Sequence, residues 1–458
     1  MQLLDIERRS DINAAVAVGQ PGSGAARRVF IETYGCQMNV SDTELMMGVL
    51  KKAGFRRALA LEDADVVLLN TCAIRERAEE RVVGRLSQLS RVKRARPDLV
   101  LGVSGCMAKH LAEQLLDRLP YVDLVVGPDS YRRLPELIGE AAGNPALDVR
   151  LDRGEDYLEL DPVRQEGTNA WITIMRGCDK FCTFCIVPYV RGRERSVPAG
   201  DLLRQVRLAA SEGFQEVTLL GQTVNSYHDG ESDFADLLKM VARVEGIRRI
   251  RFTSPHPSDF SDKLIGTIAE ESKICRFIHL PVQSGSDRVL EAMKRTYSSG
   301  RYVDLVDRLR SAVPGLCLST DVIVGFPGED DSDFESTMAL MRHVRYDSAF
   351  MFKYSPRKGT VAYREIPDTV PETEKSRRLQ AVIAQQTGIS GEINRRYVGR
   401  MQEVLVEGDA RRGKGQAVGK SDGFKTVVFP RDGIRTNTFV DIRITDATSH
   451  TLIGRPEN

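Results

Sequence analysis

Three cysteines lie within eight residues of one another, in the segment Cys178-Asp-Lys-Phe-Cys182-Thr-Phe-Cys185. A loop this short can wrap three thiolates around one face of a small inorganic cluster. Because only three ligands are supplied locally, a 4Fe-4S cluster held here would keep one iron free to bind a small molecule. The alternative is a zinc loop that lacks its fourth ligand, but no Cys or His pair stands nearby to complete tetrahedral zinc.

Three more cysteines are dispersed along the chain, and each follows a short apolar run. They are Cys36, Cys72 and Cys106, which come after predicted strands at 29–33, 66–69 and 99–103. The carboxyl ends of parallel strands form the edge where open α/β sheets bind ligands, and Gly35 and Gly105 permit tight turns there. These cysteines can therefore hold a second cluster, unless they are three unrelated buried thiols. The two remaining cysteines lie in apolar strand patterns and are predicted core thiols: Cys275 and Cys317.

Glycines and polar residues follow several predicted strands in the middle of the chain. They are Gly221, Gln222, Gln283, Gly325 and Glu329. If these strands form a β/α barrel, all five residues lie at its mouth. Glycine lets the backbone approach a bound cofactor, and Gln or Glu can hydrogen-bond the ribose or an amino group of that cofactor. Together with the cysteine segment, these loops predict a cofactor pocket.

The predicted elements divide the chain into parts of different character. Residues 1–27 are a flexible lead-in to which no function is assigned. Strands and helices alternate over 28–143, which predicts a doubly wound parallel sheet, and Ser41–Glu44 is a capping box that opens a helix. The aperiodic stretch 143–168 is a predicted linker. Six strand–helix units over 164–396 predict a partial β/α barrel, with an open sheet as the alternative, and 397–458 predicts a small all-β barrel.

The composition limits the kind of protein. The chain has 458 residues, of which 41% are apolar and 28% charged, as in globular proteins. Lys and Arg total 65 against 64 Asp and Glu, so the net charge of +1 excludes a polybasic coat and an acidic tail. Neither a membrane-spanning run nor a secretory signal is predicted, so we expect a cytoplasmic protein that does not bind a membrane.

Basic residues gather locally in spite of the low net charge. One cluster follows the cysteine segment, and others precede or lie within the predicted C-terminal barrel: Arg191, Arg193, Arg195, Arg395, Arg396, Arg400, Arg411, Arg412 and Lys414. A small β-barrel with basic turns fits the recognition of structured or single-stranded RNA. A further basic run over 81–96 is better interpreted as a solvated helix face.

Longer motifs surround both sets of cysteines. They are Thr33-Tyr-Gly-Cys-Gln-Met-Asn39, Asn70-Thr-Cys-Ala-Ile-Arg-Glu76, Gly105-Cys-Met-Ala108, Met175-Arg-Gly-Cys178 and the run from Cys182 to Glu194. With these motifs the chain resembles the methylthiotransferase family of radical S-adenosylmethionine (SAM) enzymes from residue 28 to its end. The resemblance implies a methylthiotransferase domain, a radical SAM core and a TRAM domain. Two departures are small: Thr223 stands where the family usually has Asn, and Pro255 where it more often has Ser.

The resemblance implies two different clusters. Cys178, Cys182 and Cys185, here named the SAM triad, hold a 4Fe-4S cluster that binds SAM, with Phe184 against the adenine. Cys36, Cys72 and Cys106, the auxiliary triad, hold a second 4Fe-4S cluster that carries the sulfur to be inserted. One SAM yields a 5′-deoxyadenosyl radical and another supplies the methyl group, so that a methylthio group replaces the hydrogen on carbon 2 of an adenine.

The motifs Cys36-Gln-Met-Asn39 and Cys72-Ala-Ile-Arg-Glu76 favour the members of the family that act on N6-dimethylallyladenosine, 3′ of the anticodon in tRNA. The implied partners are the tRNA anticodon loop, a reductant such as flavodoxin or ferredoxin, and a supplier of cluster sulfur. Sister enzymes that act on threonylcarbamoyl-adenosine in tRNA, or on a ribosomal-protein aspartate, are the alternatives. A non-catalytic iron–sulfur RNA-binding regulator is a different class, and it would not cleave SAM.

Overall fold

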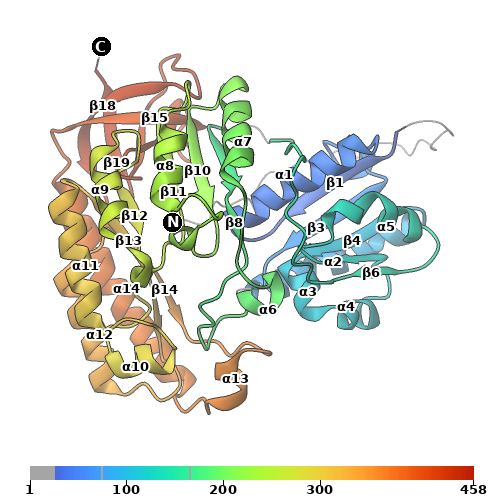
Figure 1. Ribbon diagram of the computed structural model, residues 1–458, viewed down its shortest axis with the longest axis horizontal. Coiled ribbons are helices and arrows are strands. Elements are labelled where there is room, and N and C mark those ends of the chain that lie inside the picture. Colours follow the sequence, from blue (N-terminus) through green and yellow to red (C-terminus); the bar gives the residue numbers. More distant parts are fainter. Residues whose placement is uncertain (1–25, 74–75, 165–166, 458) are drawn as a thin grey trace.

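The computed structural model describes residues 26–73, 76–164 and 167–457 (Figure 1). The lead-in expected over 1–27 therefore lies outside the described residues, except for its last two positions. Within the described ranges, no helix is both long enough and apolar enough to cross a membrane.

The N-terminal part forms a six-stranded parallel sheet in the order β2-β1-β3-β4-β5-β6. The strands are β1 (Arg28–Thr33), β2 (Arg56–Arg57), β3 (Val66–Thr71), β4 (Val100–Gly105), β5 (Leu124–Val126) and β6 (Ala146–Asp148). The helices are α1 (Gln37–Lys52), α2 (Glu76–Ala95), α3 (Cys106–Leu111), α4 (Glu113–Arg118) and α5 (Leu134–Glu140). Alternation along β3 sends Leu68 into the core under α1 and α5, and Leu69 into the core under α2, α3 and α4. The doubly wound sheet is thus confirmed.

Two local features differ from the prediction. Helix α1 begins at Gln37 and not at Ser41, because Cys36 is the N-cap residue, and the Ser41 hydroxyl instead lies 2.8 Å from the Thr173 hydroxyl of the core. Strand β6 lies inside the stretch that was predicted to be a linker, where it pairs in parallel with β5. Its three residues are too few to give a periodic signal.

The middle of the chain forms a partial β/α barrel. Its six parallel strands make two sheets, ordered β11-β10-β7 and β12-β13-β14, and an Ile250–Ile274 bridge lies where they meet. The strands are β7 (Asn169–Thr173), β10 (Glu216–Leu220), β11 (Arg249–Phe252), β12 (Phe277–His279), β13 (Cys317–Val324) and β14 (Ser348–Lys353). The outer helices are α7 (Ala199–Ser211), α8 (Phe234–Ala242), α9 (Asp262–Glu270), α11 (Ser299–Ala312), α12 (Asp331–Val344) and α14 (Glu372–Arg395). Figure 1 shows them outside the strands.

The two faces of the barrel strands differ in chemistry. Val217, Leu219 and Ile278 belong to the apolar cluster that packs against the helices. Their neighbours Thr218 and His279 lie on the opposite face, because successive residues of a strand alternate. The inside of the barrel is therefore lined partly by polar groups.

The C-terminal part is a closed five-stranded barrel in the order β15-β16-β17-β19-β18. The strands are β15 (Met401–Asp409), β16 (Gln416–Ser421), β17 (Thr426–Pro430), β18 (Phe439–Ala447) and β19 (Leu452–Pro456). Its core includes Val404, Phe429 and Ile442, which are fully buried. The fold class predicted from sequence is confirmed for all three parts.

The turn between β16 and β17 packs against the amino-terminal end of the core barrel. Arg251 donates to the carbonyls of Ser421 at 2.8 Å and Asp422 at 2.9 Å. The Phe424 ring stacks on Phe277, the first residue of β12, with ring centroids 4.9 Å apart. The C-terminal barrel therefore lies at the opposite end of the core from the loops that follow the strand carboxyl ends.

Candidate iron–sulfur centre

The SAM triad lies in a hairpin loop at the carboxyl end of β7. Strands β8 (Met175–Arg176) and β9 (Arg195–Ser196) pair antiparallel on either side of it, and α6 (Val187–Arg191) follows the last cysteine. The Cys178 amide donates to the Gly192 carbonyl at 3.1 Å, which closes the loop. Gly177 has a φ of +79° and lies against the Arg193 carbonyl so closely that no side chain fits.

The three thiols of the SAM triad are held close together. Burial is the largest of the causes that raise the pKa of Cys185 to about 12, and the neighbouring Cys182 and Cys178 are the others. Burial likewise raises the pKa of Cys178, whose Sγ lies 3.4 Å from the Thr223 hydroxyl. Arg295 donates from Nη1 to the Cys182 sulfur at 3.3 Å. Metal must displace the thiol protons, and the Arg295 guanidinium opposes the rise in the pKa of Cys185, which favours the thiolate form that binds iron.

The auxiliary triad converges at the carboxyl edge of the N-terminal sheet. Cys36 is the N-cap of α1, Cys72 follows β3, and Cys106 begins α3 directly after β4. The close approach requires glycine: a Cβ on Gly35 would lie 2.8 Å from the Cys72 Cβ, and one on Gly105 would lie 2.5 Å from the Thr71 carbonyl. The pKa of Cys36 is lowered to about 6, chiefly by a hydrogen bond with Cys72 and with a contribution from Arg191, which together outweigh burial.

The donor sets suit clusters better than single ions. Each triad offers three sulfurs at a strand edge, and none of the eight cysteines is in a disulfide. Among the residues that the structure describes, no group of three or more His, Cys, Asp or Glu could hold a single metal ion. The thiolates of a 4Fe-4S cluster each bind a different iron, so a cluster does not need them to meet at one point.

A buried ion network, which the sequence did not predict, joins the two triads. Arg191 donates from Nε to the Cys106 sulfur at 3.1 Å and from Nη2 to Asp42 at 2.7 Å. Arg176 of β8 pairs with the other Asp42 oxygen at 2.9 Å. Burial alone would raise the pKa of Asp42, but the two guanidinium groups outweigh burial and lower it. The loop that carries the SAM triad thus contacts the auxiliary triad directly.

The loops predicted to form the SAM pocket meet around the core strands' carboxyl ends. Gly221 lies against Met175, so that a Cβ would approach its Cγ to 2.5 Å. The Gln222 Oε1 atom is buried and has no hydrogen-bond partner among the described residues, as expected of a group that awaits a ligand. Gln283 has a φ of +72°, and its main chain bridges to Val322 of β13.

The other predicted pocket residues contribute mainly structure. The Glu329 carboxylate accepts from the Gly325 amide at 2.9 Å and from Arg378 at 2.9 Å, so it supports the Gly325 loop from beneath. Phe184 packs on a cluster that includes Phe326, the residue after Gly325. The cysteine loop and the glycine loop are therefore adjacent. Of the three polar pocket residues, Gln222, Gln283 and Glu329, only Gln222 has a buried side-chain atom without a partner among the described residues.

The basic segments have different fates. Arg191 is 4% exposed and pairs inside the protein, so its assignment to an RNA-facing cluster is wrong. Arg195 pairs with Asp129, which ties the hairpin to the N-terminal sheet. In the basic run 81–96, most of which belongs to α2, Arg85 pairs with Glu32. The basic turn of the C-terminal barrel lies on the surface: Arg411, Arg412 and Lys414.

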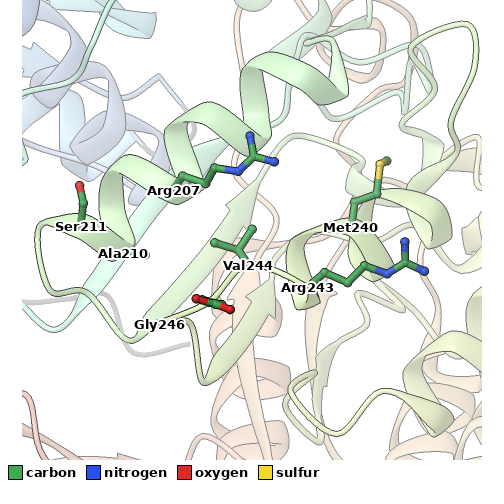
Figure 2. A pocket seen from close by; sticks show the side chains of 8 residues that line it. Arg207, Ala210, Ser211, Met240, Arg243, Val244 and Gly246 are labelled. Carbon is green, nitrogen blue, oxygen red and sulfur yellow. The ribbon is translucent and has the colours of Figure 1, made fainter.

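A surface cavity of about 590 Å³ lies away from both triads (Figure 2). It sits where α7 and α8 end, beside the amino-terminal ends of the core strands. Its lining includes Arg207, Met240 and Arg243. Because the strand carboxyl ends carry the cysteines, this cavity is not part of the candidate centre.

Comparison with known proteins assigns the three parts. Residues 28–127 match the uncharacterized protein family UPF0004, residues 172–341 the radical SAM superfamily, and residues 395–456 the TRAM domain. A solved radical SAM methyltransferase, TsrM from Kitasatospora setae with cobalamin and a [4Fe-4S] cluster bound, shares the fold, with a TM-score of 0.54. It is 14% identical and covers 86% of this chain and 77% of its own.

Curated relatives extend over almost the whole chain. The tRNA-2-methylthio-N(6)-dimethylallyladenosine synthase of Chloroherpeton thalassium is 47% identical, over 93% of this chain and 95% of its own. That of Chlorobium luteolum is 48% identical, over 94% and 97%. That of Porphyromonas gingivalis is 46% identical, over 93% and 94%. With this identity over nearly full length, the chain belongs to the tRNA-2-methylthio-N(6)-dimethylallyladenosine synthase family of radical SAM methylthiotransferases.

Proposed function

We propose that this protein converts N6-dimethylallyladenosine to its 2-methylthio derivative at the adenosine 3′ of the tRNA anticodon. The observation that carries the proposal is the convergence of two separate cysteine triads on neighbouring strand edges, joined through Arg191. A single cluster would account for one triad only. The activity for which the relatives are named and the match to a TRAM domain support tRNA as the substrate.

The SAM triad would hold a 4Fe-4S cluster with SAM on its open iron, and the auxiliary triad a second 4Fe-4S cluster. When bound, the first supplies the electron that cleaves SAM, and the second supplies the sulfur. We assign the protein's own groups as follows. Gln222 hydrogen-bonds SAM through its unpaired oxygen, Gln283 offers a second polar contact, and Phe184 borders the adenine. Gly221 and Gly325 keep the strand-end turns tight, because a Cβ at either position would meet Met175 or Lys375.

The barrel interior would receive the target adenine, because a carbon radical must be shielded from water and other hydrogen donors. Asp321 on β13 contacts His279 at 3.3 Å, and the Phe350 ring lies 5.8 Å from the His279 ring. These groups offer a polar edge beside an apolar wall. Filling an apolar pocket with the dimethylallyl group is worth about 0.8 kcal/mol per buried methylene, so five carbons supply a few kcal/mol of preference over plain adenosine.

The anticodon loop is single-stranded, so the adenine can be turned out of its stack at low cost. We expect the reaction in the cytoplasm, with a reductant such as flavodoxin or ferredoxin and a supplier of cluster sulfur as partners. We also propose the division of the chain into parts 28–148, 164–396 and 397–458, in which β6 moves the end of the first part from residue 143 to Asp148.

Anaerobic reconstitution followed by nucleoside mass analysis tests the proposal. The protein should bind about eight irons per chain, as two four-iron clusters require. With reductant and SAM it should methylthiolate tRNA from cells that make the dimethylallyl group, and leave tRNA from cells that lack it unchanged. Cys275→Ala is the matched control, since this thiol is buried in the core and should leave the iron content unchanged.

Three results would refute the proposal. Stoichiometric zinc without iron would exclude the clusters. Equal methylthiolation of both tRNAs would exclude the apolar pocket. A modified ribosomal protein beside untouched tRNA would exclude the substrate class.

A further inference from the structure

Arg191 makes a polar contact from the loop of the SAM triad to a cysteine of the auxiliary triad. It ends α6, six positions after Cys185 of the SAM triad, and its Nε donates to the sulfur of Cys106 in the auxiliary triad at 3.1 Å. The side chain is 4% exposed. A guanidinium this deep in the protein cannot exchange its sulfur contact for water.

The carboxylate beside Arg191 is shared between two guanidinium groups. Asp42 is fully buried and pairs with both Arg191 at 2.7 Å and Arg176 at 2.9 Å. The other acidic groups that act on Arg191 are Tyr131 and two thiols of the auxiliary triad. The Nη1 atoms of Arg191 and Arg176 are buried without a hydrogen-bond partner among the described residues. Buried donors of this kind normally meet an acceptor, and here the protein supplies none.

An auxiliary cluster with three thiolate ligands would be the missing acceptor. Three thiolates give such a cluster a net negative charge, and its reduction adds one more. Hydrogen bonds to ligand sulfur and nearby positive charge both stabilise the reduced form, and hence raise the reduction potential. A buried charge acts more strongly than an exposed one, because solvent does not screen it.

We propose that Arg191 is a positioning residue of the auxiliary cluster, which raises its reduction potential through the Cys106 sulfur and fixes it relative to the SAM triad. Asp42 and Arg176 hold the guanidinium in place from α1 and β8. The proposal rests on the function proposed above, since it requires the second cluster. The proposed effect comes from one hydrogen bond and one positive charge, both of Arg191, and it requires no group outside the protein and its cluster.

The test isolates the auxiliary cluster in the full-length chain. A background variant in which all three cysteines of the SAM triad are Ala should hold about four irons per chain after reconstitution. Dithionite titration followed by electron paramagnetic resonance then reports the midpoint potential of this cluster alone. If the background variant binds no cluster, the proposed function fails; if it binds one, the effect of Arg191 can be judged separately.

On this background, Arg191→Met should lower the reduced-to-oxidised ratio at a fixed potential at least tenfold, a shift of about 59 mV for one electron. Arg191→Lys keeps the charge beside Asp42 but loses the Nε donor, so its shift should be smaller and of the same sign. Arg193→Met is the matched control: it lies in the same loop, is 53% exposed and should not change the potential. Circular dichroism checks that each variant folds. If Arg191→Met does not fold, the potential of Arg191→Lys decides the test. Unchanged potentials in both Arg191 variants would overturn the proposal.

Discussion

The turn between β16 and β17 should stabilise the core barrel as well as its own domain. We predict that Phe424→Ala lowers the free energy of unfolding by about 2.5–3.5 kcal/mol. Truncating a fully buried Phe costs about 3–5 kcal/mol, and the half-buried Phe424 should lose about half of that. Its stacking on Phe277, at 4.9 Å between centroids, adds about 1 kcal/mol.

The backbone at Phe424 makes the prediction sharper. Its φ is +61°, in the left-handed region that costs a non-glycine residue about 1 kcal/mol. Phe424→Gly loses the same ring but is free of that cost, so it should be about 1 kcal/mol more stable than Phe424→Ala. In an ordinary strand or helix the order of these two variants would be the reverse.

The chain's single tryptophan, Trp171 on β7, provides the assay, because it reports the core and not the C-terminal barrel. Its fluorescence should show lower urea midpoints for both variants, in the stated order. A double-mutant cycle with Phe277→Ala should give a coupling of about 1 kcal/mol. Leu59→Ala, at a residue 87% exposed, is the control and should change stability by less than about 0.5 kcal/mol. A Trp171 transition that does not move would show that the turn does not support the core, and a Gly variant less stable than the Ala variant would refute the backbone argument.

The other predictions concern the candidate centre. Replacing the three cysteines of the SAM triad by Ala should abolish reductive SAM cleavage. Replacing those of the auxiliary triad should leave some formation of 5′-deoxyadenosine but abolish the methylthio product, and chromatography measures both products. Methylthio product from the auxiliary-triad variant without added sulfide would refute the sulfur assignment. Asp42→Asn should cost about 3–5 kcal/mol in urea unfolding, because it leaves two buried guanidinium groups without a carboxylate. Because the pKa of Asp42 is lowered in the folded protein, the stabilisation from its ion pairs should be present at any pH above the ordinary carboxyl pKa. It should be lost only as the pH falls through the lower folded-state pKa, and a loss already near neutral pH would contradict this prediction. Gln222→Leu should weaken SAM binding about fivefold with little change in the rate at saturation, since one hydrogen bond is worth about 1 kcal/mol; unchanged affinity in a binding titration would exclude the contact.

The positions that sequence predicted well are those with local causes. A cysteine directly after an apolar strand lies at the sheet edge whatever the rest of the chain does, and so the approach of Cys36, Cys72 and Cys106 followed from three short patterns. Strand and helix alternation likewise predicted both α/β parts. Helix α1 begins earlier than the predicted capping box indicated. Its N-cap residue is Cys36, whose side chain makes no capping hydrogen bond, so the usual sequence signal for a helix start is missing there.

The residues that sequence missed have partners far along the chain. Arg191 looked like part of a basic surface, yet its carboxylate partner Asp42 is 149 positions away. Arg295 reaches Cys182 across 113 positions. No periodicity marks such pairs, because each depends on how two sheets meet and not on local geometry. The position of Arg191 next to a cysteine motif therefore predicted a positive charge there, but not that the side chain points into the protein.

The arrangement of the two ends of the core constrains how an RNA can lie on this protein. Both triads follow strand carboxyl ends, whereas the β16–β17 turn packs on the amino-terminal end, near Arg251 and Phe277. Strand β13 between these ends has eight residues, about 26 Å of extended chain. In the reaction proposed above, an adenine turned into the barrel mouth would lie about that far from the C-terminal barrel, so RNA held at the basic turn would be contacted well away from the base that reacts. Under that proposal, recognition of the dimethylallyl group and attachment of the tRNA would be tasks of separate surfaces, held at a fixed distance because the turn is packed into the core.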